Sequence, residues 1–547
     1  MHSPAFSVVL LAGALGTCGA STAASKLLAQ GIEALGGFSQ LSQVSGVSYV
    51  GGDIFRTKGV MQTYSLGGMD VPVAATGSQN VTFSYDGNDL RQRIDVRHKL
   101  GSYWTFARPL LEDVVYSMVV HGGKKGFAAI VEGSYSIWLP DAPSQGNLDG
   151  LLAAFLINEA HKLSPLLLLQ ILSNQNFTLR SEVVLTGQKL PAVHDRNLGL
   201  SVVFDIESYL PYIVRSTTNH SIFGSSTYDL LLTDYISVEG ILFPTRIKTI
   251  LNRRRLLGDY RVEHIVVNPT IDGTTFQGPG NVSESHLPRR SPEYGFAEIS
   301  EWSTGYMWYG EWERALLNFT ITQPFDDLPG LWHLDPGEVP SAYKQSILEF
   351  EHGVVVLDAP PHQSLLIIEW IRKDLRKPIT HVWPSHHHHD HATGLKDYVN
   401  IGAKIIVLDE AKSYYQNISG VEFATFTTDV PFVLKDRKMH AKFIHMAESF
   451  HAFDQSYVVV TPACITENST MAIFDADHVT PAIFNQIEQA APMELLDRVA
   501  HDRISDDAVL ISAHEAIMPI KALHNVTGYL APGYSNLDFR FGSSDCE

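Results

Sequence analysis

The sequence predicts an α+β protein in two parts: an N-terminal curved antiparallel sheet with helices, and a C-terminal part in which strands alternate with helices. A chain of 547 residues, 45% hydrophobic and 18% charged, is long enough for at least two domains with separate cores. Residues 25–275 are rich in alternating, β-branched and aromatic stretches, which are typical of strands. In residues 328–535 short apolar runs alternate with amphipathic ones, and a linker at 276–327, rich in Gly, Pro and Ser at its start, separates the two parts.

The N-terminus predicts export. Residues 6–20, FSVVLLAGALGTCGA, form a short apolar run that ends in small residues, which is the pattern of a signal peptide, here 1–22. An uncleaved anchor is the alternative, because little positive charge precedes the run. No later segment holds about 18 uninterrupted apolar residues, so no other membrane span is expected.

The charge and the glycosylation acceptors agree with a secreted protein. A net charge of -19 disfavours binding to nucleic acids and anionic membranes, so neither is expected as a partner, and a small-molecule substrate stays open. Cys464 and Cys546 remain beyond the signal peptide, and a disulfide or two free thiols are both open. Eight Asn-X-Ser/Thr acceptors predict a glycoprotein if the source is eukaryotic: Asn80, Asn176, Asn219, Asn281, Asn318, Asn417, Asn468 and Asn525.

The N-terminal half contains consecutive strand patterns at 201–218, 226–251 and 258–271, with turns expected at 210–211, 239–240 and 258–259. Residues 150–172 predict helices broken near Ser164-Pro165. The "LP" turn, "DYISVEGILFPTRI" and a strand ending in "VNP" resemble the bacterial outer-membrane lipoprotein-carrier fold. That resemblance implies a half-barrel that holds acyl chains, whereas a scaffold packed on the catalytic part is the plainer interpretation.

The C-terminal half begins with two strands in 341–361 that turn at His352-Gly353. A helix follows at 364–375 with Ser364 as its N-cap, then strands at 379–384 and 403–409 flank a helix at 394–402. Acidic or histidine residues stand where these strands end. Open α/β sheets place their sites at strand ends, so we expect the functional site there.

The segment SHHHHDHATG, residues 385–394, carries four consecutive histidines. If it is extended, His386 and His388 point one way while His387 and His389 point the other. Asp390 and His391 then follow as the chain turns into the helix near 393–394. Two imidazoles two residues apart suit one metal ion, and a carboxylate beside a third imidazole suits a second.

This pattern, followed by Gly394, resembles the signature of the metallo-β-lactamase superfamily, and the resemblance implies an αββα sandwich over 328–535. The superfamily's further motifs occur in order: Asp358 after a strand, a lone His451, then Asp477 and His514 at strand ends. Ala476 and Ala513 stand where the family often has glycine. Asp475 competes with Asp477 for the bridging role, and the spacing from the strand favours Asp477.

By this resemblance the chain would be a metal-dependent hydrolase that holds two Zn²⁺ ions, with Fe or Mn acceptable at such donors. A metal-bound hydroxide would attack an ester, lactone, thioester or amide carbonyl, and Asp390 would orient it and pass a proton to the leaving group. Asp358 would support a ligand histidine. The implied ligands are His386, His388 and His451 for one metal, Asp390, His391 and His514 for the other, and Asp477 as the bridge.

Two other functions remain open: a mononuclear iron sulfur-dioxygenase, and a lipid-binding carrier with a non-catalytic metal site. A flavin-linked diiron reductase would need glutamate in place of His388. The aromatic residues at 302–312 would form a wall for a hydrophobic substrate or pack between domains. His387 and His389 are expected to lie behind the ligands or in solvent. The remaining histidines carry no assigned role: His352, His362, His381, His445 and His478.

Overall fold

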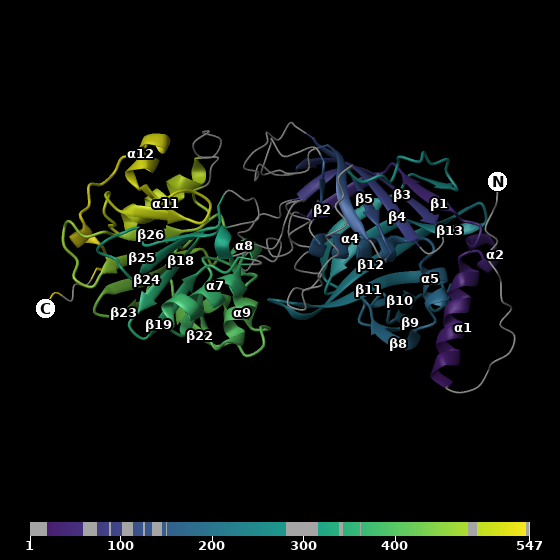
Figure 1. The fold of residues 1–547 in the computed structure, drawn as a ribbon, viewed down its shortest axis with the longest axis horizontal. Helices are drawn as coiled ribbons and strands as arrows, with labels where there is room; N and C mark the ends of the chain where they lie inside the picture. Colours follow the sequence, from purple (N-terminus) through teal and green to yellow (C-terminus); the bar gives the residue numbers. More distant parts are fainter. Residues whose placement is uncertain are drawn as a thin grey trace.

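The chain folds into two lobes, which Figure 1 shows side by side. The structure is a computed structural model that describes residues 19–57, 74–86, 89–100, 113–123, 126–133, 145–148, 150–279, 316–337, 343–360, 363–479, 489–542 and 546. Most of the predicted signal peptide, the aromatic segment 302–312 and His362 lie outside these residues.

The N-terminal lobe is built on one antiparallel sheet of 15 strands among the described residues, in the order β7-β6-β5-β4-β3-β2-β14-β13-β12-β11-β10-β9-β8, with β1 and β15 paired beside it. Its elements are α1 (Gly19–Ala34), α2 (Phe38–Leu41), β1 (Gly46–Val50), β2 (Asp53–Thr57), β3 (Ala74–Asp86), β4 (Asp89–Leu100), β5 (Val114–His121), β6 (Phe127–Gly133), β7 (Gly146–Asn147), α4 (Gly150–Leu163), α5 (Leu167–Asn174), β8 (Phe177–Val183), β9 (Lys189–Asp195), β10 (Leu200–Phe204), β11 (Pro211–His220), β12 (Gly224–Val238), β13 (Ile241–Leu251), β14 (Arg255–Arg261) and β15 (His264–Val267). The predicted antiparallel sheet is therefore present.

Two of the predicted breaks in this lobe occur where expected. Helices α4 and α5 meet at 164–166 with a bend of 105°, and Glu239 and Gly240, both at positive φ, form the tight turn between β12 and β13. The turn predicted at 258–259 is wrong, because Gly258 lies inside β14, next to a bulge in its pairing with β13. A glycine within a strand commonly marks a bulge rather than a turn, and the chain turns at 252–254 instead.

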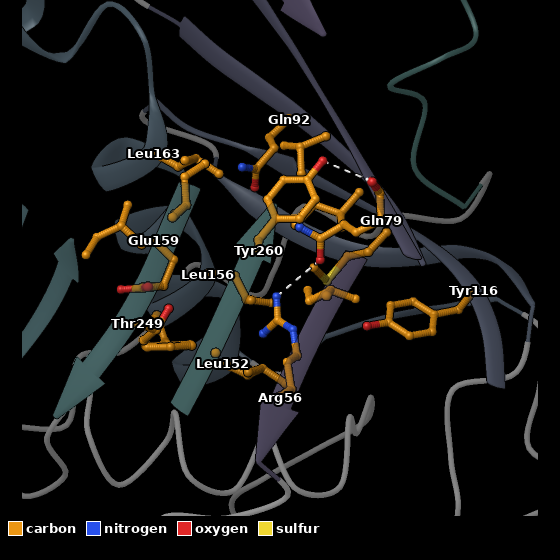
Figure 2. A pocket seen from close by; sticks show the side chains of 18 of the residues that line it. Arg56, Gln79, Gln92, Tyr116, Leu152, Leu156, Glu159, Leu163, Thr249 and Tyr260 are labelled. Atoms are coloured by element: carbon orange, nitrogen blue, oxygen red, sulfur yellow. Dashed lines mark hydrogen bonds between the residues drawn. The ribbon is translucent and has the colours of Figure 1, made fainter. Parts of the chain in front are cut away.

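Helix α4 covers a cavity of about 140 Å³ inside the curved sheet. Strands β2–β6 and β12–β14 supply most of its wall, and apolar side chains predominate there. Arg56 enters this space and donates a hydrogen bond to Gln79 at 3.3 Å, as Figure 2 shows. In the described part of the chain no single helix is long and apolar enough to cross a membrane; α4 and α5 reach that length only as a sharply bent pair.

The C-terminal lobe contains a sheet in the order β16-β17-β18-β19-β20-β21-β22 and another in the order β23-β24-β25-β26-β27-β28. Its elements are η1 (Leu316–Asn318), β16 (Thr320–Thr322), β17 (Leu331–Asp335), β18 (Gln345–Phe350), β19 (Gly353–Leu357), α7 (Ser364–Trp370), η2 (Ile371–Leu375), β20 (Ile379–Trp383), α8 (His389–Ala392), α9 (Leu395–Asn400), β21 (Lys404–Leu408), η3 (Asp409–Ala411), α10 (Lys412–Tyr415), β22 (Phe423–Phe426), β23 (Phe432–Lys435), β24 (Met439–His445), β25 (Ser456–Pro462), β26 (Ala472–Asp475), α11 (Ala490–His501), β27 (Val509–Ser512), β28 (Met518–Pro519), α12 (Lys521–Thr527) and η5 (Asn536–Asp538).

The two sheets of this lobe pack face to face with helices outside them. Alternate residues of a strand face opposite sides, and β25 shows this directly: Val458 and Val460 join the core shared with the first sheet and α7, while Tyr457 and Val459 join the core shared with α11 and α12. Strands β19 to β22 run parallel, as do β26 and β27. Their carboxyl ends are the edges that carry the acidic and histidine residues.

The boundaries of this lobe differ in detail from the sequence prediction. Strand β16 at 320–322 already belongs to its first sheet, so the sheet starts before residue 328. Cys464 and Cys546 form a disulfide, which holds the chain end beyond residue 535 to the lobe. Ser364 is the first residue of α7 rather than its N-cap, because its hydroxyl donates to the Asp397 carboxylate of α9.

Candidate metal centre

The histidine run leaves the end of β20 in a series of bends, and α8 begins at His389. The expected extended geometry and the helix start near 393–394 are therefore wrong. The bends nevertheless bring the rings of His386 and His388 together, with 4.3 Å between their centroids. These two rings are therefore neighbours, as predicted, although a bent backbone and not an extended one brings them together.

The structure brings all seven predicted side chains into two adjoining clusters, which are buried except for the partly exposed His514. Within each cluster one possible ligand atom per residue lies within 4.8 Å of the others. The first cluster contains His386, His388, His451 and Asp477; the second contains Asp390, His391, His514 and Asp477.

Asp477 belongs to both clusters because its two carboxylate oxygens face different imidazoles. Its Oδ2 lies 2.8 Å from His451 Nε2 and 3.3 Å from His386 Nε2. Its Oδ1 lies 2.7 Å from His514 Nε2 and 2.9 Å from His391 Nε2. This is the placement expected of a carboxylate that bridges two cations.

Asp358 fixes the orientation of the second cluster from behind. Its Oδ2 is 2.9 Å from Nδ1 of His391, and its Oδ1 accepts the backbone N–H of Ser385 at 2.7 Å. With the proton on Nδ1, the Nε2 lone pair of His391 points into the cluster. Asp358 sits at φ 61°, an uncommon conformation that β19 and β20 enforce through the bond from its N–H to the Trp383 carbonyl.

His387 turns away from the clusters as expected, and it is fully buried, which agrees with a position behind the ligands and not with a solvated one. Its Nδ1 lies 2.8 Å from Asp454 Oδ1, and Tyr415 donates to the other oxygen of Asp454 at 3.3 Å. His389 is also buried. Asp454 is a residue that the sequence analysis missed, although its position three residues after His451 was a usable signal.

The rival for the bridging role, Asp475, is occupied elsewhere. Both its oxygens lie 3.0 Å from Nδ1 of His478, whose Nε2 lies 3.2 Å from Glu494. Burial alone would lower the pKa of His478, but these two carboxylates raise it to about 10. The pair therefore forms an ionic support next to Asp477 and leaves Asp477 to face the clusters.

The other unassigned histidines lie outside both clusters. His445 contacts Thr428 and the carbonyl of Phe453, His381 contacts its neighbour Thr380, and His352 is exposed on a turn. Tyr343, which the sequence analysis also missed, packs edge-on against the rings of His514 and His391 at 4.9 and 5.9 Å. It is a wall residue of the second cluster.

The charges of the site suit a cation. Burial lowers the pKa of His386 and lowers that of His388 well below the usual value, so both are neutral imidazoles. Burial would raise the pKa of Asp390 and Asp477, but neighbouring imidazoles, His391 first, hold both pKa values below the usual range. Burial would lower the pKa of His391, but Asp477, Asp390 and Asp358 raise it well above the usual value. Because ionised carboxylates and neutral imidazoles are the forms that bind metal ions, His391 would release a proton when a cation binds.

Several buried atoms in the clusters make no hydrogen bond of good geometry with the described residues, although imidazole nitrogens lie as close as 2.8 Å to Asp477 Oδ2. They include Asp390 Oδ1, His391 Nε2 and Asp477 Oδ2. An unsatisfied buried polar group costs about 1–3 kcal/mol, and more when it is charged. A divalent cation in each cluster would satisfy these atoms with nitrogen and oxygen donors of the kinds that zinc, iron and manganese accept. The residues present therefore fit a metal cofactor.

Comparisons with known proteins give fold likenesses only. No family model matches the chain, and no curated protein matches it. Among solved structures, a metallo-beta-lactamase from Pontibacter korlensis is 15% identical over 38% of this chain and 97% of its own, with a TM-score of 0.29. One from Hirschia baltica is 13% identical over 38% and 96%, with a TM-score of 0.28. A flavo di-iron protein from Thermotoga maritima is 16% identical over 38% and 60%, with a TM-score of 0.30.

Proposed function

We propose that this chain is a metal-dependent hydrolase that cleaves an ester, lactone, thioester or amide in the C-terminal lobe. The observation that carries the proposal is the pair of buried clusters that share Asp477, one oxygen toward each. Their position at the carboxyl ends of parallel strands is where open sheets place catalytic groups. We expect two Zn²⁺ ions per chain, with Fe or Mn as substitutes.

The bound cations would polarise the carbonyl and lower the pKa of water toward neutrality. Asp477 sets the spacing between the two clusters, and Asp358 keeps the His391 ring turned so that its Nε2 faces inward. Asp390 begins as a carboxylate because its pKa lies below the usual range. Its unpartnered Oδ1 can accept a proton from the nucleophile and return it to the leaving group.

The test combines metal analysis with a hydrolysis panel of lactone, thioester, aryl-ester and β-lactam substrates. His388→Ala should remove metal from the first cluster and abolish hydrolysis, whereas the matched His387→Ala should retain two metals at saturating zinc. One iron per chain with no hydrolysis would favour the sulfur-dioxygenase alternative. A wild-type chain that binds two metals and cleaves none of the substrates would contradict the hydrolase proposal.

We also propose that the protein is secreted and glycosylated. The seven acceptor asparagines among the described residues are all exposed, and the disulfide suits an oxidising compartment. Expression in a eukaryotic secretion host should give medium-borne protein whose mass falls on endoglycosidase treatment and whose N-terminus lies near residue 23. Protein retained in cells with residue 1 intact would contradict this proposal.

A second candidate function, carriage of a hydrophobic ligand, is favoured by the cavity in the N-terminal lobe. Its lining is mainly apolar, and the Nε of Arg56 is buried without a hydrogen-bond partner among the described residues. The lining also contains the carboxylates of Glu159 and Asp259, but Lys162 and Arg246 pair with them at 2.8 and 2.7 Å. Arg56 is therefore the cation that an anionic amphiphile would meet in this cavity. A fluorescent fatty acid should bind wild type and bind Arg56→Met more weakly; equal binding would remove this candidate.

A further inference from the structure

The long hairpin of β11 and β12 reaches from the N-terminal lobe toward the C-terminal lobe (Figure 1). Its turn, residues 221–223, contains Ile222, which is fully buried in the core of the C-terminal lobe, and Phe223, which packs against the cores of both lobes. Gly224 at φ +67° comes close to the Asn417 carbonyl, where an added Cβ would lie at 3.3 Å. The turn is therefore fitted into the other lobe.

The turn is also held by contacts within its own hairpin. Nδ1 of His220 accepts the backbone N–H groups of Ile222 and Phe223 at 3.1 and 3.2 Å, and its ring stacks on Phe223 at 4.5 Å. His220 itself is buried and pairs with Gly224 across the hairpin. A turn held this way presents the Phe223 ring in one orientation.

A continuous line of ring contacts leads from this turn to the histidine run. Phe223 meets Tyr414 edge-on at 5.6 Å, and Tyr414 meets His387 edge-on at 5.0 Å. Asp454 fixes the other side of His387 through Nδ1 at 2.8 Å and through its backbone N–H at 3.3 Å. His387 is thus clamped between an aromatic ring and a carboxylate.

His387 stands between two residues of the first cluster, His386 and His388, and its ring lies 4.8 Å from that of His388. The run here is bent rather than part of a strand, so no sheet hydrogen bonds hold His387 and His388 in register. Ligand geometry depends on groups behind the ligands, whose loss typically costs 10- to 100-fold in metal affinity. The clamp on His387 lies behind this cluster, together with the Ser385 hydroxyl, which is 3.0 Å from Nδ1 of His386.

We propose that the 221–223 turn of the N-terminal sheet is a positioning element of the first metal cluster and acts through Tyr414 and His387. This inference rests on the proposed metal centre. It gives the N-terminal lobe a role in the chemistry that is independent of any ligand in its own cavity, and it makes Phe223 and Tyr414 positioning residues that touch neither metal nor substrate.

The test is metal binding by the full-length chain, measured by zinc competition with a chromogenic chelator and by the visible spectrum of the Co²⁺-loaded protein. Phe223→Ala should weaken one of two equivalents about tenfold and shift the Co²⁺ bands, while the equivalent at the second cluster stays unchanged. Phe223→Leu, which keeps apolar volume without the ring, should give the same direction with a smaller effect. Ile213→Val, which shortens a buried side chain of β11 outside the turn, is the matched control and should bind like wild type.

The double variant Phe223→Leu with His387→Gln tests whether Phe223 positions the first cluster through His387 or only helps to hold the two lobes together. If both act along one line of contacts, the double variant should lose no more affinity than His387→Gln alone. The inference would be overturned if the fold-losses in zinc affinity of the two single variants multiplied in the double variant. It would also be overturned if Phe223→Leu had wild-type affinity and a wild-type spectrum. A wild-type chain that binds no metal would instead refute the proposed function, so the two failures are distinguishable.

Discussion

Replacing Asp358 with asparagine should selectively weaken the second metal cluster. Asp358 accepts two hydrogen bonds, from Ser385 N–H at 2.7 Å and from Nδ1 of His391 at 2.9 Å. An asparagine has one acceptor oxygen and one NH₂ group, so it satisfies only one of these donors. If it serves Ser385, its NH₂ faces His391 and favours the tautomer whose Nε2 carries the proton, which cannot bind metal.

The expected loss follows from that single interaction. A hydrogen bond to a charged group contributes about 1.5–3 kcal/mol, which corresponds to roughly a 10- to 150-fold weaker site. Asparagine tolerates the positive φ of this position, so the fold should survive. Asp502→Asn, at a buried carboxylate bonded to Tyr457 and Arg540, is the control for loss of a buried charge.

Stepwise zinc titration against a chelator distinguishes the two clusters. Asp358→Asn should show one equivalent of wild-type affinity and one that is weakened, while Asp502→Asn should show two unchanged equivalents. Two unchanged equivalents in Asp358→Asn would refute the assignment of Asp358 as the support of His391.

Three further outcomes are expected from features remote from the site. Arg215→Met should lower the free energy of unfolding, measured by urea titration, by about 3–5 kcal/mol. It leaves the buried Asp229 without the guanidinium that donates two hydrogen bonds of 2.7 Å, and adding Asp229→Leu should restore most of the loss. Cys464→Ser with Cys546→Ser should cost about 4–5 kcal/mol from loop entropy, because the disulfide spans 82 residues; an unchanged melting temperature would contradict this. Burial lowers the pKa of His98 to about 3, so between pH 6.5 and 3 only the unfolded chain binds a proton at this histidine. The free energy of unfolding should therefore fall by about 1.4 kcal/mol per pH unit as the pH drops through that window. His98→Phe should flatten this slope in acid melting curves.

The candidate ligands were predictable because they are local signals in chain order. Each stands just after a strand pattern or inside the run at 385–394, and strand ends converge in a sheet with parallel strands. The alternation of side chains along an extended strand grouped His386 with His388, and their rings do lie together, although the run is bent and not extended. The bends that replace the expected strand arise from bonds to Asp358 and Asp454, which no local pattern contains.

The residues that support the ligands could not be predicted in the same way. Asp454 reaches His387 across 67 positions, and Phe223 lies in the other lobe. Such contacts depend on how sheets and lobes pack, and a sequence pattern reports only periodicity within one element. The same limit explains Gly258: its place inside a strand is fixed by pairing with β13 and β2, whereas the local sequence favoured a turn.

The pairing of β1 with β15 has a consequence for how the chain folds. Val47 lies opposite Val267, so the first and last strands of the N-terminal sheet are neighbours. Contacts between such distant residues close a large loop and slow folding. During synthesis β1 can pair with β15 only after the whole N-terminal lobe has left the ribosome. The 221–223 turn can contact the C-terminal lobe only after that lobe has been made. The two lobes should therefore acquire their contacts with each other late.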